Sequence, residues 1–218
     1  MKTYFDIGAN KGDYTNYLLT NLNADKVICV EANKFEANVL SSRYVHNNVI
    51  IINKAISNIN NESIPFYVCP ECDVVSTADE QWRTNSRFSQ PDRQWIKTLI
   101  NTITIDELIK EYGIPTHIKL DVEGYEYVAL QGMTKNYCQL RFEWAEEKID
   151  EMVLSLQHLI KIGYTTFGVM AGDTYHSIPE EYMSGTDMIE FLKNKCDPAR
   201  KDLWGMIFCL RDEDSYVV

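Results

Sequence analysis

The chain has 218 residues, a length typical of one α/β domain that can bury most of its unfolded surface. Hydrophobic residues make up 45% and charged residues 24%, as in ordinary globular proteins. No apolar run approaches the ~20 residues that a membrane-spanning helix needs. The formal net charge of −11 argues against nonspecific binding to nucleic acids or anionic lipids. Four basic residues make the middle of the chain less acidic than the rest: Arg83, Arg87, Arg93 and Lys97.

The N-terminus and the cysteines favour a cytoplasmic protein. The first residues lead straight into an apolar strand, with no signal peptide. Cys29 and Cys209 lie in apolar strands, where a buried thiol behaves as a small hydrophobic group. Cys69 and Cys72 form a single C-x-x-C pair, which without a second pair predicts a turn with two thiols rather than a zinc or redox site. The sequence does not indicate an oligomeric state.

Strands and helices alternate along the chain, which predicts a mostly parallel sheet with helices on both faces. The first half is expected to contain strand 3–7, helix 12–22, strand 26–31, helix 35–45, strand 49–56 and an edge strand at 63–68. The second half is expected to contain strand 100–103, helix 105–112, strand 116–122, helix 125–131, strand 138–144, helix 149–162, strand 164–170, helix 187–195 and strand 203–210.

Residues 69–100 interrupt this alternation. The part from about 72 to 97 is polar and without clear periodicity, and it carries Trp82, Phe88 and Trp95. Such long segments are usually functional lids or disordered, and the aromatic residues argue against full disorder. We therefore expect one domain over 1–218 with a lid or insertion at about 69–100, mobile when the site is empty and folding over it when ligands bind.

The opening βαβ unit predicts a nucleoside site. A strand ends at Asp6-Ile7, a turn with Gly8 and Gly12 follows, and the next strand ends at Glu31. An acidic residue about 20 positions past a glycine turn, at the end of the second strand, is where such a unit binds a ribose. A dinucleotide fingerprint has a middle glycine that admits the pyrophosphate, and here it is replaced around Asn10. This spacing resembles motif I of class I S-adenosylmethionine (SAM) methyltransferases.

Polar residues gather at the predicted carboxyl ends of five strands. In open α/β sheets, ligands bind outside these ends, at the switch point of the strand order. The residues that fall there are Asp6, Glu31, Ala55-Ile56-Ser57, Asp121-Val122-Glu123 and Glu143. We therefore expect these residues to line one crevice.

The run from 117 to 126 is the second strong signal. Strand alternation places Lys119, Asp121 and Glu123 on one side. Burying a lysine beside two carboxylates is costly unless they pair, so a structural ion pair of Lys119 is one interpretation and a catalytic group is the other. Gly124 permits a sharp exit, and Glu126 begins the next helix.

Four segments together resemble the FkbM family of SAM-dependent methyltransferases. They are Asp-Ile-Gly-Ala-Asn-x-Gly at 6–12, Glu-Ala-Asn at 31–33, Thr-Ile-Asp-Glu-Leu at 104–108 and Lys-Leu-Asp-Val-Glu-Gly-Tyr-Glu at 119–126. Ser76-Thr77 is similar to the paired-hydroxyl segment of that family. The resemblance covers roughly residues 3–145. The chain begins almost on the first strand, without the N-terminal helices that often help to close the acceptor site in this family.

The resemblance implies a fold, a reaction and a cofactor. The implied fold is α/β and Rossmann-like: a mostly parallel seven-stranded sheet with helices on both faces and an antiparallel C-terminal strand. The implied reaction is O-methylation by SAM of a small-molecule or glycan acceptor, often a sugar or glycosylated metabolite. We assign cofactor binding to Asp6, Gly8, Asn10, Gly12, Tyr14, Thr15, Glu31, Ala32, Asn33, Ala55, Ile56 and Asp121.

The catalytic step needs a group that takes the hydroxyl proton or stabilises the developing charge. Asp121 is the first candidate, and the candidate set also includes Glu123, Lys119 and His176. Asp121, Glu123 and Glu143 could instead gather a divalent cation such as Mg²⁺ through oxygen ligands. No His, Asp or Glu cluster has clean metal spacing, so we do not expect a metal.

Two other functions stay open from the sequence. A nicotinamide-dependent oxidoreductase would share the βαβ opening, but the replaced middle glycine argues against it. A SAM-binding interaction module without catalysis is the second alternative. The intact Asp121, Glu123 and Glu126 argue against that one.

Overall fold

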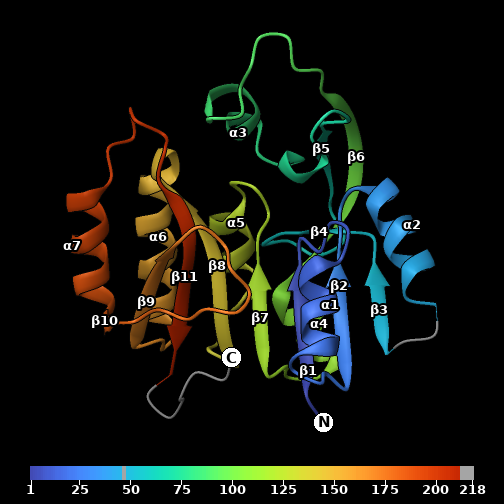
Figure 1. Ribbon diagram of the computed structural model, residues 1–218, viewed down its shortest axis with the longest axis horizontal. Coiled ribbons are helices and arrows are strands. Elements are labelled where there is room, and N and C mark those ends of the chain that lie inside the picture. Colours follow the sequence, from blue (N-terminus) through green and yellow to red (C-terminus); the bar gives the residue numbers. More distant parts are fainter. Residues whose placement is uncertain (46–47, 212–218) are drawn as a thin grey trace.

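An eight-stranded sheet forms the centre of the protein, as a computed structural model that describes residues 1–45 and 48–211 shows (Figure 1). Its strand order is β10 (Tyr182–Ser184), β9 (Thr166–Ala171), β11 (Trp204–Leu210), β8 (Gln139–Ala145), β7 (His117–Leu120), β1 (Thr3–Ile7), β2 (Lys26–Val30) and β3 (Val49–Ile52). The five strands from β8 to β3 are parallel, whereas β11 is antiparallel to both of its neighbours. The predicted α/β architecture, with its antiparallel C-terminal strand, is confirmed.

Two details of the predicted sheet are wrong. The sheet has eight strands rather than seven, because the short β10 pairs antiparallel with β9 in a stretch that was expected to be irregular. The strand predicted at 49–56 ends at Ile52. The side-chain amide of the next residue, Asn53, donates hydrogen bonds to the backbone carbonyls of Glu31 and Ala32. Residues Ala55–Ile56 (β4) then join a separate small sheet with β5 (Ser63–Val68) and β6 (Ile96–Ile103).

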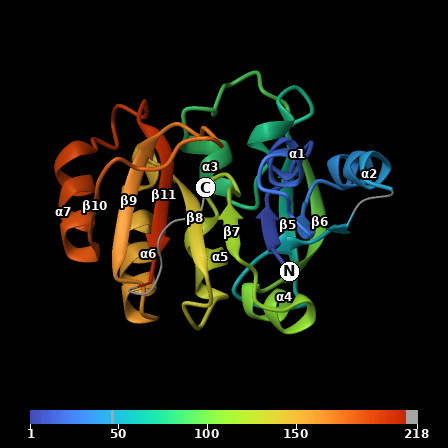
Figure 2. The same ribbon diagram turned by 60° about the horizontal axis from the view of Figure 1, so that its bottom comes forward.

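Helices cover the two faces of the main sheet unequally. The helices α1 (Asp13–Thr20) and α2 (Lys34–Arg43) share one hydrophobic cluster with β1 and β2. On the other face, a larger cluster contains residues of α4 (Ile105–Tyr112), α5 (Glu126–Gln131), α6 (Ile149–Lys161) and α7 (Gly185–Lys195). Helices α7 and α2 lie at opposite ends of the molecule (Figures 1 and 2). None of the helices in the described residues is long and apolar enough to cross a membrane.

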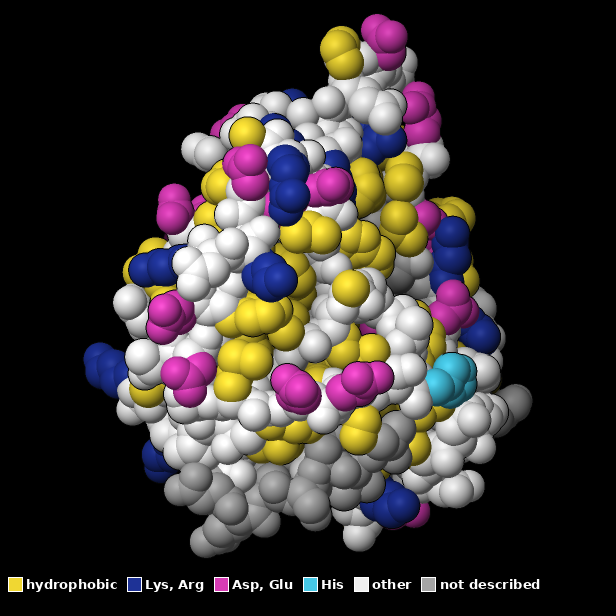
Figure 3. All heavy atoms as spheres, turned by 60° about the vertical axis from the view of Figure 1, so that its left-hand side comes forward, with side chains coloured by type: hydrophobic (Ala, Val, Ile, Leu, Met, Phe, Trp, Pro, Cys, Tyr) yellow, Lys and Arg dark blue, Asp and Glu magenta, His cyan; other side chains and the backbone are white. Residues whose placement is uncertain are grey.

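The alternation of side chains along β1 explains the two clusters. Phe5 and Ile7 point into the larger cluster, and Tyr4 points into the smaller one. Over β9 and β11, the α1 side of the sheet is crossed by the segment 172–181 rather than by a helix (Figure 1). Figure 3 shows hydrophobic side chains gathered on this side of the molecule, where Trp204 and Ile178 are exposed.

Residues 69–100 form a cover above the carboxyl edge of the main sheet (Figure 1). The cover contains a short 3-10 turn η1 (Asp73–Val75), helix α3 (Glu80–Asn85) and the start of β6. The Lys11 ammonium lies 2.6 Å from the Asp73 carboxylate, which ties η1 to the turn after β1. The Lys148 ammonium lies 2.5 Å from the Asp79 carboxylate, which ties α3 to the start of α6. The cover therefore contacts both halves of the sheet edge.

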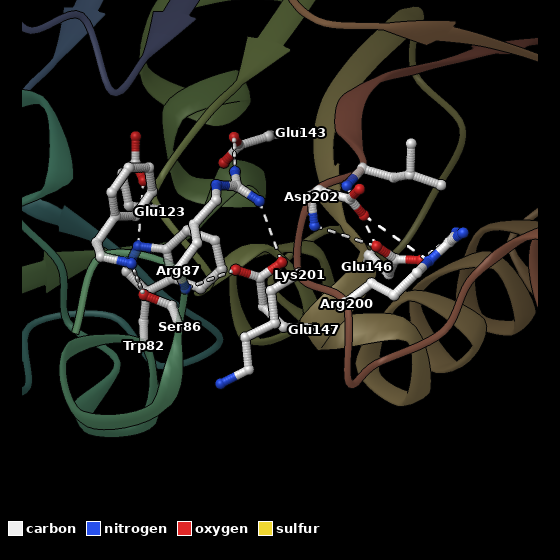
Figure 4. A network of polar contacts seen from close by, with 12 residues as sticks. Trp82, Ser86, Arg87, Glu123, Glu143, Glu146, Glu147, Arg200, Lys201 and Asp202 are labelled. Carbon is white, nitrogen blue, oxygen red and sulfur yellow. Dashed lines mark hydrogen bonds and ion pairs between the residues drawn. The ribbon is translucent and has the colours of Figure 1, made fainter.

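Glu146 organises the link between α7 and β11. Its carboxylate is fully buried at the start of the 3-10 turn η2 (Glu146–Lys148). It accepts hydrogen bonds from the backbone N–H groups of Asp197 at 2.6 Å, Asp202 at 3.2 Å and Leu203 at 3.2 Å, and from Arg200 at 3.0 Å (Figure 4). Burial alone would raise the pKa of Glu146, but these hydrogen bonds lower it to about 2.

The variant Glu146→Gln should therefore lose stability. Removing the charge weakens several charge-assisted hydrogen bonds, so we expect the free energy of unfolding in urea to fall by about 1–3 kcal/mol at pH 7. A carboxyl with a lowered pKa stabilises the fold above its unfolded pKa and loses this effect as pH falls toward about 2. The difference between parent and variant should therefore shrink below pH 5. Glu107→Gln, at an exposed ion pair with Lys110, is the control and should change stability little.

Candidate functional site

Two adjoining cavities lie at the carboxyl ends of β1, β2 and β7, where the sequence predicts a crevice. Both are open to solvent, and the space in and above them amounts to about 520 Å³ and about 550 Å³. Both are lined by Gly8, Asn10, Val74, Asp121 and Glu123. The first cavity is also lined by Glu31, Ala32, Ala55, Ile56, Phe66 and Tyr125. The second is also lined by Asp6, Lys11, Asp13, Tyr14, Lys119 and Tyr175.

The turn after β1 passes directly against the end of β7. The backbone N–H groups of Gly8 and Ala9 both donate to the Val30 carbonyl, at 2.9 and 3.2 Å. Gly8 has a φ of +81°, and a Cβ atom there would lie 1.7 Å from the Asp121 carbonyl oxygen. Only glycine fits both the left-handed conformation and this close approach. Asn10, with a φ of 44°, continues the turn and lines both cavities.

Glu31 ends β2 and is held by two backbone groups. Its Oε2 accepts a hydrogen bond from Asn10 N at 2.7 Å, and its Oε1 accepts one from Asn33 N at 2.7 Å. Burial raises the pKa of Glu31 to about 7, despite these hydrogen bonds. Each carboxylate oxygen keeps a second lone pair. The group is therefore placed to accept further hydrogen bonds from hydroxyls in the first cavity.

Asp6 is a fully buried carboxylate that lines the second cavity. Its Oδ2 accepts a hydrogen bond from the Thr15 hydroxyl at 2.5 Å, whereas its Oδ1 is buried without a hydrogen-bond partner in the described residues. Burial raises the pKa of Asp6, although Lys119 opposes this shift. An unpaired buried acceptor is costly, so a donor from a ligand would be stabilised here.

The predicted ion pair of Lys119 is present. Its ammonium lies 2.6 Å from the Asp121 carboxylate and 3.5 Å from that of Asp173. Burial alone would lower the pKa of Lys119, but the carboxylates of Asp121, Asp173 and Asp6 raise it above its usual value. Sequence reasoning missed Asp173 and Tyr175, which lie in the irregular segment after β9.

Three carboxylates meet beside the two cavities. Oxygens of Asp121, Glu126 and Glu143 all lie within 4.8 Å of one another. Burial raises the pKa of Glu126 to about 7, and burial followed by the charges of Glu123 and Asp121 raises that of Glu143 well above its usual value. Such oxygen ligands suit Mg²⁺. Of the three residues named from the sequence as metal ligands, Asp121 and Glu143 lie in this group, with Glu126 in place of Glu123.

Glu123 lies outside this group of three and contacts the cover. Its Oε2 accepts a hydrogen bond from Trp82 Nε1 at 3.1 Å, and its carbonyl accepts one from the Thr77 hydroxyl at 2.7 Å. Burial raises the pKa of Glu123 well above its usual value, and the charge of Asp121 adds to this shift. Glu123 is thus a partly buried carboxylate that borders both cavities and contacts the cover.

Arg87 brings a positive charge from the cover to the carboxylates. Its guanidinium lies 3.1 Å from Glu147 and 3.6 Å from Glu143 (Figure 4). The same group lies over the rings of Trp82, Phe88 and Trp204, at 5.2, 4.9 and 5.5 Å from their centroids. The sequence shows Arg87 only as one of several basic residues in an aperiodic segment, so its role as a counter-charge was not predicted.

Four of the residues assigned to catalysis or cofactor binding line neither cavity, and neither do Glu143 and Ser57, which were also expected at the crevice. His176 is exposed, and its ring packs edge-on against Tyr17 at 4.7 Å between centroids. Thr15 is bonded to Asp6, Asn33 caps the start of α2, and Gly12 precedes α1 with a φ of +85°. Thr15, Asn33 and Gly12 therefore stabilise the elements around the crevice without lining it.

A family model agrees with the motifs. It is described as "Methyltransferase FkbM domain" and matches residues 6–197. The precorrin-6y C5,15-methyltransferase of Geobacter metallireducens GS-15 is similar in structure at 10% identity, over 97% of this chain and 80% of that one, with a TM-score of 0.45. The plantazolicin methyltransferase BpumL in complex with SAH is similar at 10% identity, over 96% of this chain and 76% of that one, also with a TM-score of 0.45. No curated protein matches the chain.

The close approach at Gly8 predicts the effect of Gly8→Ala. The added methyl group would overlap the Asp121 carbonyl, so we expect the free energy of unfolding in urea to fall by roughly 2–4 kcal/mol. Gly113→Ala is the matched control: Gly113 has a φ of +88° but no atom within 4 Å of its Cβ position. With a ψ of 170°, it should cost about 1–3 kcal/mol of backbone strain, with no added cost of overlap. Equal losses in the two variants would contradict the tight turn.

Proposed function

Because the chain belongs to the FkbM family of SAM-dependent methyltransferases, we propose that it transfers the methyl group of SAM to a hydroxyl of a small-molecule or glycan acceptor. The reaction is an in-line displacement at the sulfonium methyl, for which the cofactor supplies the reactivity. The protein positions the two reactants and supplies a base. One observation carries the proposal. The cavity that Glu31 lines is also lined by Asp121, whose carboxylate lies beside those of Glu126 and Glu143.

The residues of the crevice fit SAM. Glu31 would accept hydrogen bonds from the ribose hydroxyls through the free lone pairs of its carboxylate. Asp6, whose Oδ1 has no protein partner, would accept a hydrogen bond from the ammonium group of the methionine part. Ala55, Ile56 and Phe66 give the first cavity an apolar wall for the adenine. No group in this set requires a pyrophosphate, which supports SAM over a dinucleotide.

SAM affinity should depend on pH through Glu31. The ribose hydroxyls bind the ionised carboxylate, whose pKa is about 7 in the empty site, so binding must release a proton below that pH. We expect affinity to rise roughly tenfold between pH 6 and pH 8, and calorimetry in two buffers of different ionisation enthalpy should detect the released proton.

Two variants and one other ligand complete this test. Glu31→Ala should weaken SAM binding by about tenfold or more, and Glu31→Gln should abolish the pH dependence. Glu111→Gln, on the exposed end of α4, is the control and should bind SAM like the parent. NAD⁺ should not bind. Parent-like SAM affinity in Glu31→Ala would remove this residue from the site.

We propose Glu123, rather than Asp121, as the base. Asp121 is the first candidate from the sequence, but its carboxylate is already engaged by the Lys119 ammonium at 2.6 Å. Glu123 borders both cavities, and burial raises its pKa well above its usual value, which makes it a stronger proton acceptor than an ordinary carboxylate. The Lys119–Asp121 ion pair lines the second cavity next to Glu123.

Turnover should report the role of Glu123. Glu123→Gln keeps the shape and removes the basic oxygen, so we expect kcat to fall at least ~100-fold while SAM affinity stays within about twofold. In the parent, kcat should rise with pH beyond the usual carboxyl range, because the active form is deprotonated. Glu80→Gln, on the exposed side of α3, is the control.

The alternative to a base is a metal ion at Asp121, Glu126 and Glu143. If a chelator abolishes turnover and Mg²⁺ restores it, the metal replaces Glu123 as the group that activates the hydroxyl. Parent-like turnover in Glu123→Gln, with no effect of the chelator, would contradict both versions.

We also propose that the cover at 69–100 acts as a lid over this site. Val74 lines both cavities, and the Lys11–Asp73 ion pair spans from the turn after β1 to the cover. The cover thus borders the space that cofactor and acceptor would share, where exclusion of water favours methyl transfer.

A further inference from the structure

We propose that Thr77 and Trp82, on the cover, are positioning residues that hold Glu123 in its working orientation. Thr77 acts on the backbone of Glu123 and Trp82 acts on its carboxylate. The inference rests on the proposed function, in which Glu123 faces the reacting groups. It adds a second role for the cover, which is to fix the position of Glu123 as well as to border the cavities.

The backbone of Glu123 needs support. Its φ is 54°, in the left-handed region that residues with a Cβ atom rarely adopt, and Gly124 follows with a φ of +86°. Such a conformation persists only where the surroundings hold it. The Thr77 hydroxyl donates a hydrogen bond of 2.7 Å to the Glu123 carbonyl, which is the contact that spans from the cover to this strained residue.

Thr77 is itself held in a defined place. It is fully buried, and its N–H and carbonyl pair with the backbone of Tyr67 on β5 at 3.0 and 2.8 Å. Its hydroxyl oxygen also accepts a hydrogen bond from Asp79 N at 2.9 Å. Because the oxygen accepts from one side, its single proton is free to be donated to Glu123. The small sheet of β5 thereby sets the position of the Glu123 backbone.

Trp82 holds the other end of the residue. Its side chain is 1% exposed, and its Nε1–H donates to Glu123 Oε2 at 3.1 Å (Figure 4). The indole lies so close to Gly124 that a Cβ atom there would be 2.8 Å from the ring. Residues 123 and 124 are therefore shaped to receive this indole. The side chain of Asp79 caps α3 at Gln81 N and Trp82 N, which fixes the helix that carries it.

The charges around Glu123 come from several elements. Asp121 follows β7, Glu126 begins α5 and Glu143 lies on β8, and all three are acidic. Arg87, from the cover, opposes them. Among these charges, the Trp82 hydrogen bond is the neutral contact that holds the Glu123 carboxylate against the cover. Removing that donor should therefore free the Glu123 side chain without removing any charge.

The first test compares two buried tryptophans. Trp82→Phe removes the donor to Glu123. Trp144→Phe is the matched control: Trp144, on β8, is also buried, but its Nε1–H donates to the Met170 carbonyl at 3.3 Å and not to Glu123. The readout is the side-chain conformation of Glu123 in crystal structures of the ligand-free proteins. We expect the Glu123 carboxylate to leave its place beside residue 82 in Trp82→Phe and to keep it in Trp144→Phe.

The second test uses the hydroxyl of Thr77. Thr77→Val keeps the shape and removes the donor, whereas Thr77→Ser keeps the donor. We expect kcat to fall about tenfold in Thr77→Val and to recover in Thr77→Ser, with SAM affinity unchanged in both. If Trp82→Phe does not fold, this pair decides the question by itself.

Two results would overturn the positioning role. One is a parent-like Glu123 conformation in folded Trp82→Phe, and the other is equal kcat in Thr77→Val and Thr77→Ser. The crystal structures require no acceptor, so they test the positioning even if the chain transfers no methyl group. Conversely, parent-like turnover in Glu123→Gln would remove the proposed base while leaving a displaced Glu123 side chain in Trp82→Phe intact.

Discussion

The compensation of buried carboxylates at one edge of the sheet is the constraint on which the site depends. A buried, unpaired carboxylate is costly, so each one must be paired, hydrogen-bonded or protonated. Lys119 supplies positive charge from within the sheet, because β7 places it beside Asp6 on β1 and its ammonium pairs with Asp121. Arg141, its neighbour on β8, adds a second positive charge. Arg87 supplies positive charge from the cover, against Glu143. Removing one of these cations would leave carboxylates of this edge with less compensating charge.

This constraint links the fold to the reaction. Parallel strands end at one edge, so their terminal residues meet without any sequence proximity. The carboxylates with the most strongly raised pKa values, at Glu123 and Glu143, lie where the cover meets the sheet. In the proposed role of the cover as a lid, its opening would expose them to water and remove the Trp82 donor and the Arg87 charge together. Closure of the lid and the proton affinity of the carboxylates would then be coupled.

The sequence predicted the parts of the site that local patterns encode. The Gly8 turn and Glu31 follow from one βαβ unit, and both line the expected cavity. The break after Ile52 was missed because apolar residues resume at Ala55–Ile56, directly after the polar pair Asn53-Lys54, and were assigned to the same strand. Arg87 was missed because its partners lie 56 and 60 positions away, on β8 and η2, and no periodicity connects them.

A crystal structure of the protein with SAH tests the central claim most directly. The account predicts that both ribose hydroxyls lie within hydrogen-bond distance of the Glu31 carboxylate, that the amino group lies against Asp6, and that the sulfur faces Glu123. SAH bound elsewhere, or bound with its ribose away from Glu31, would contradict the account.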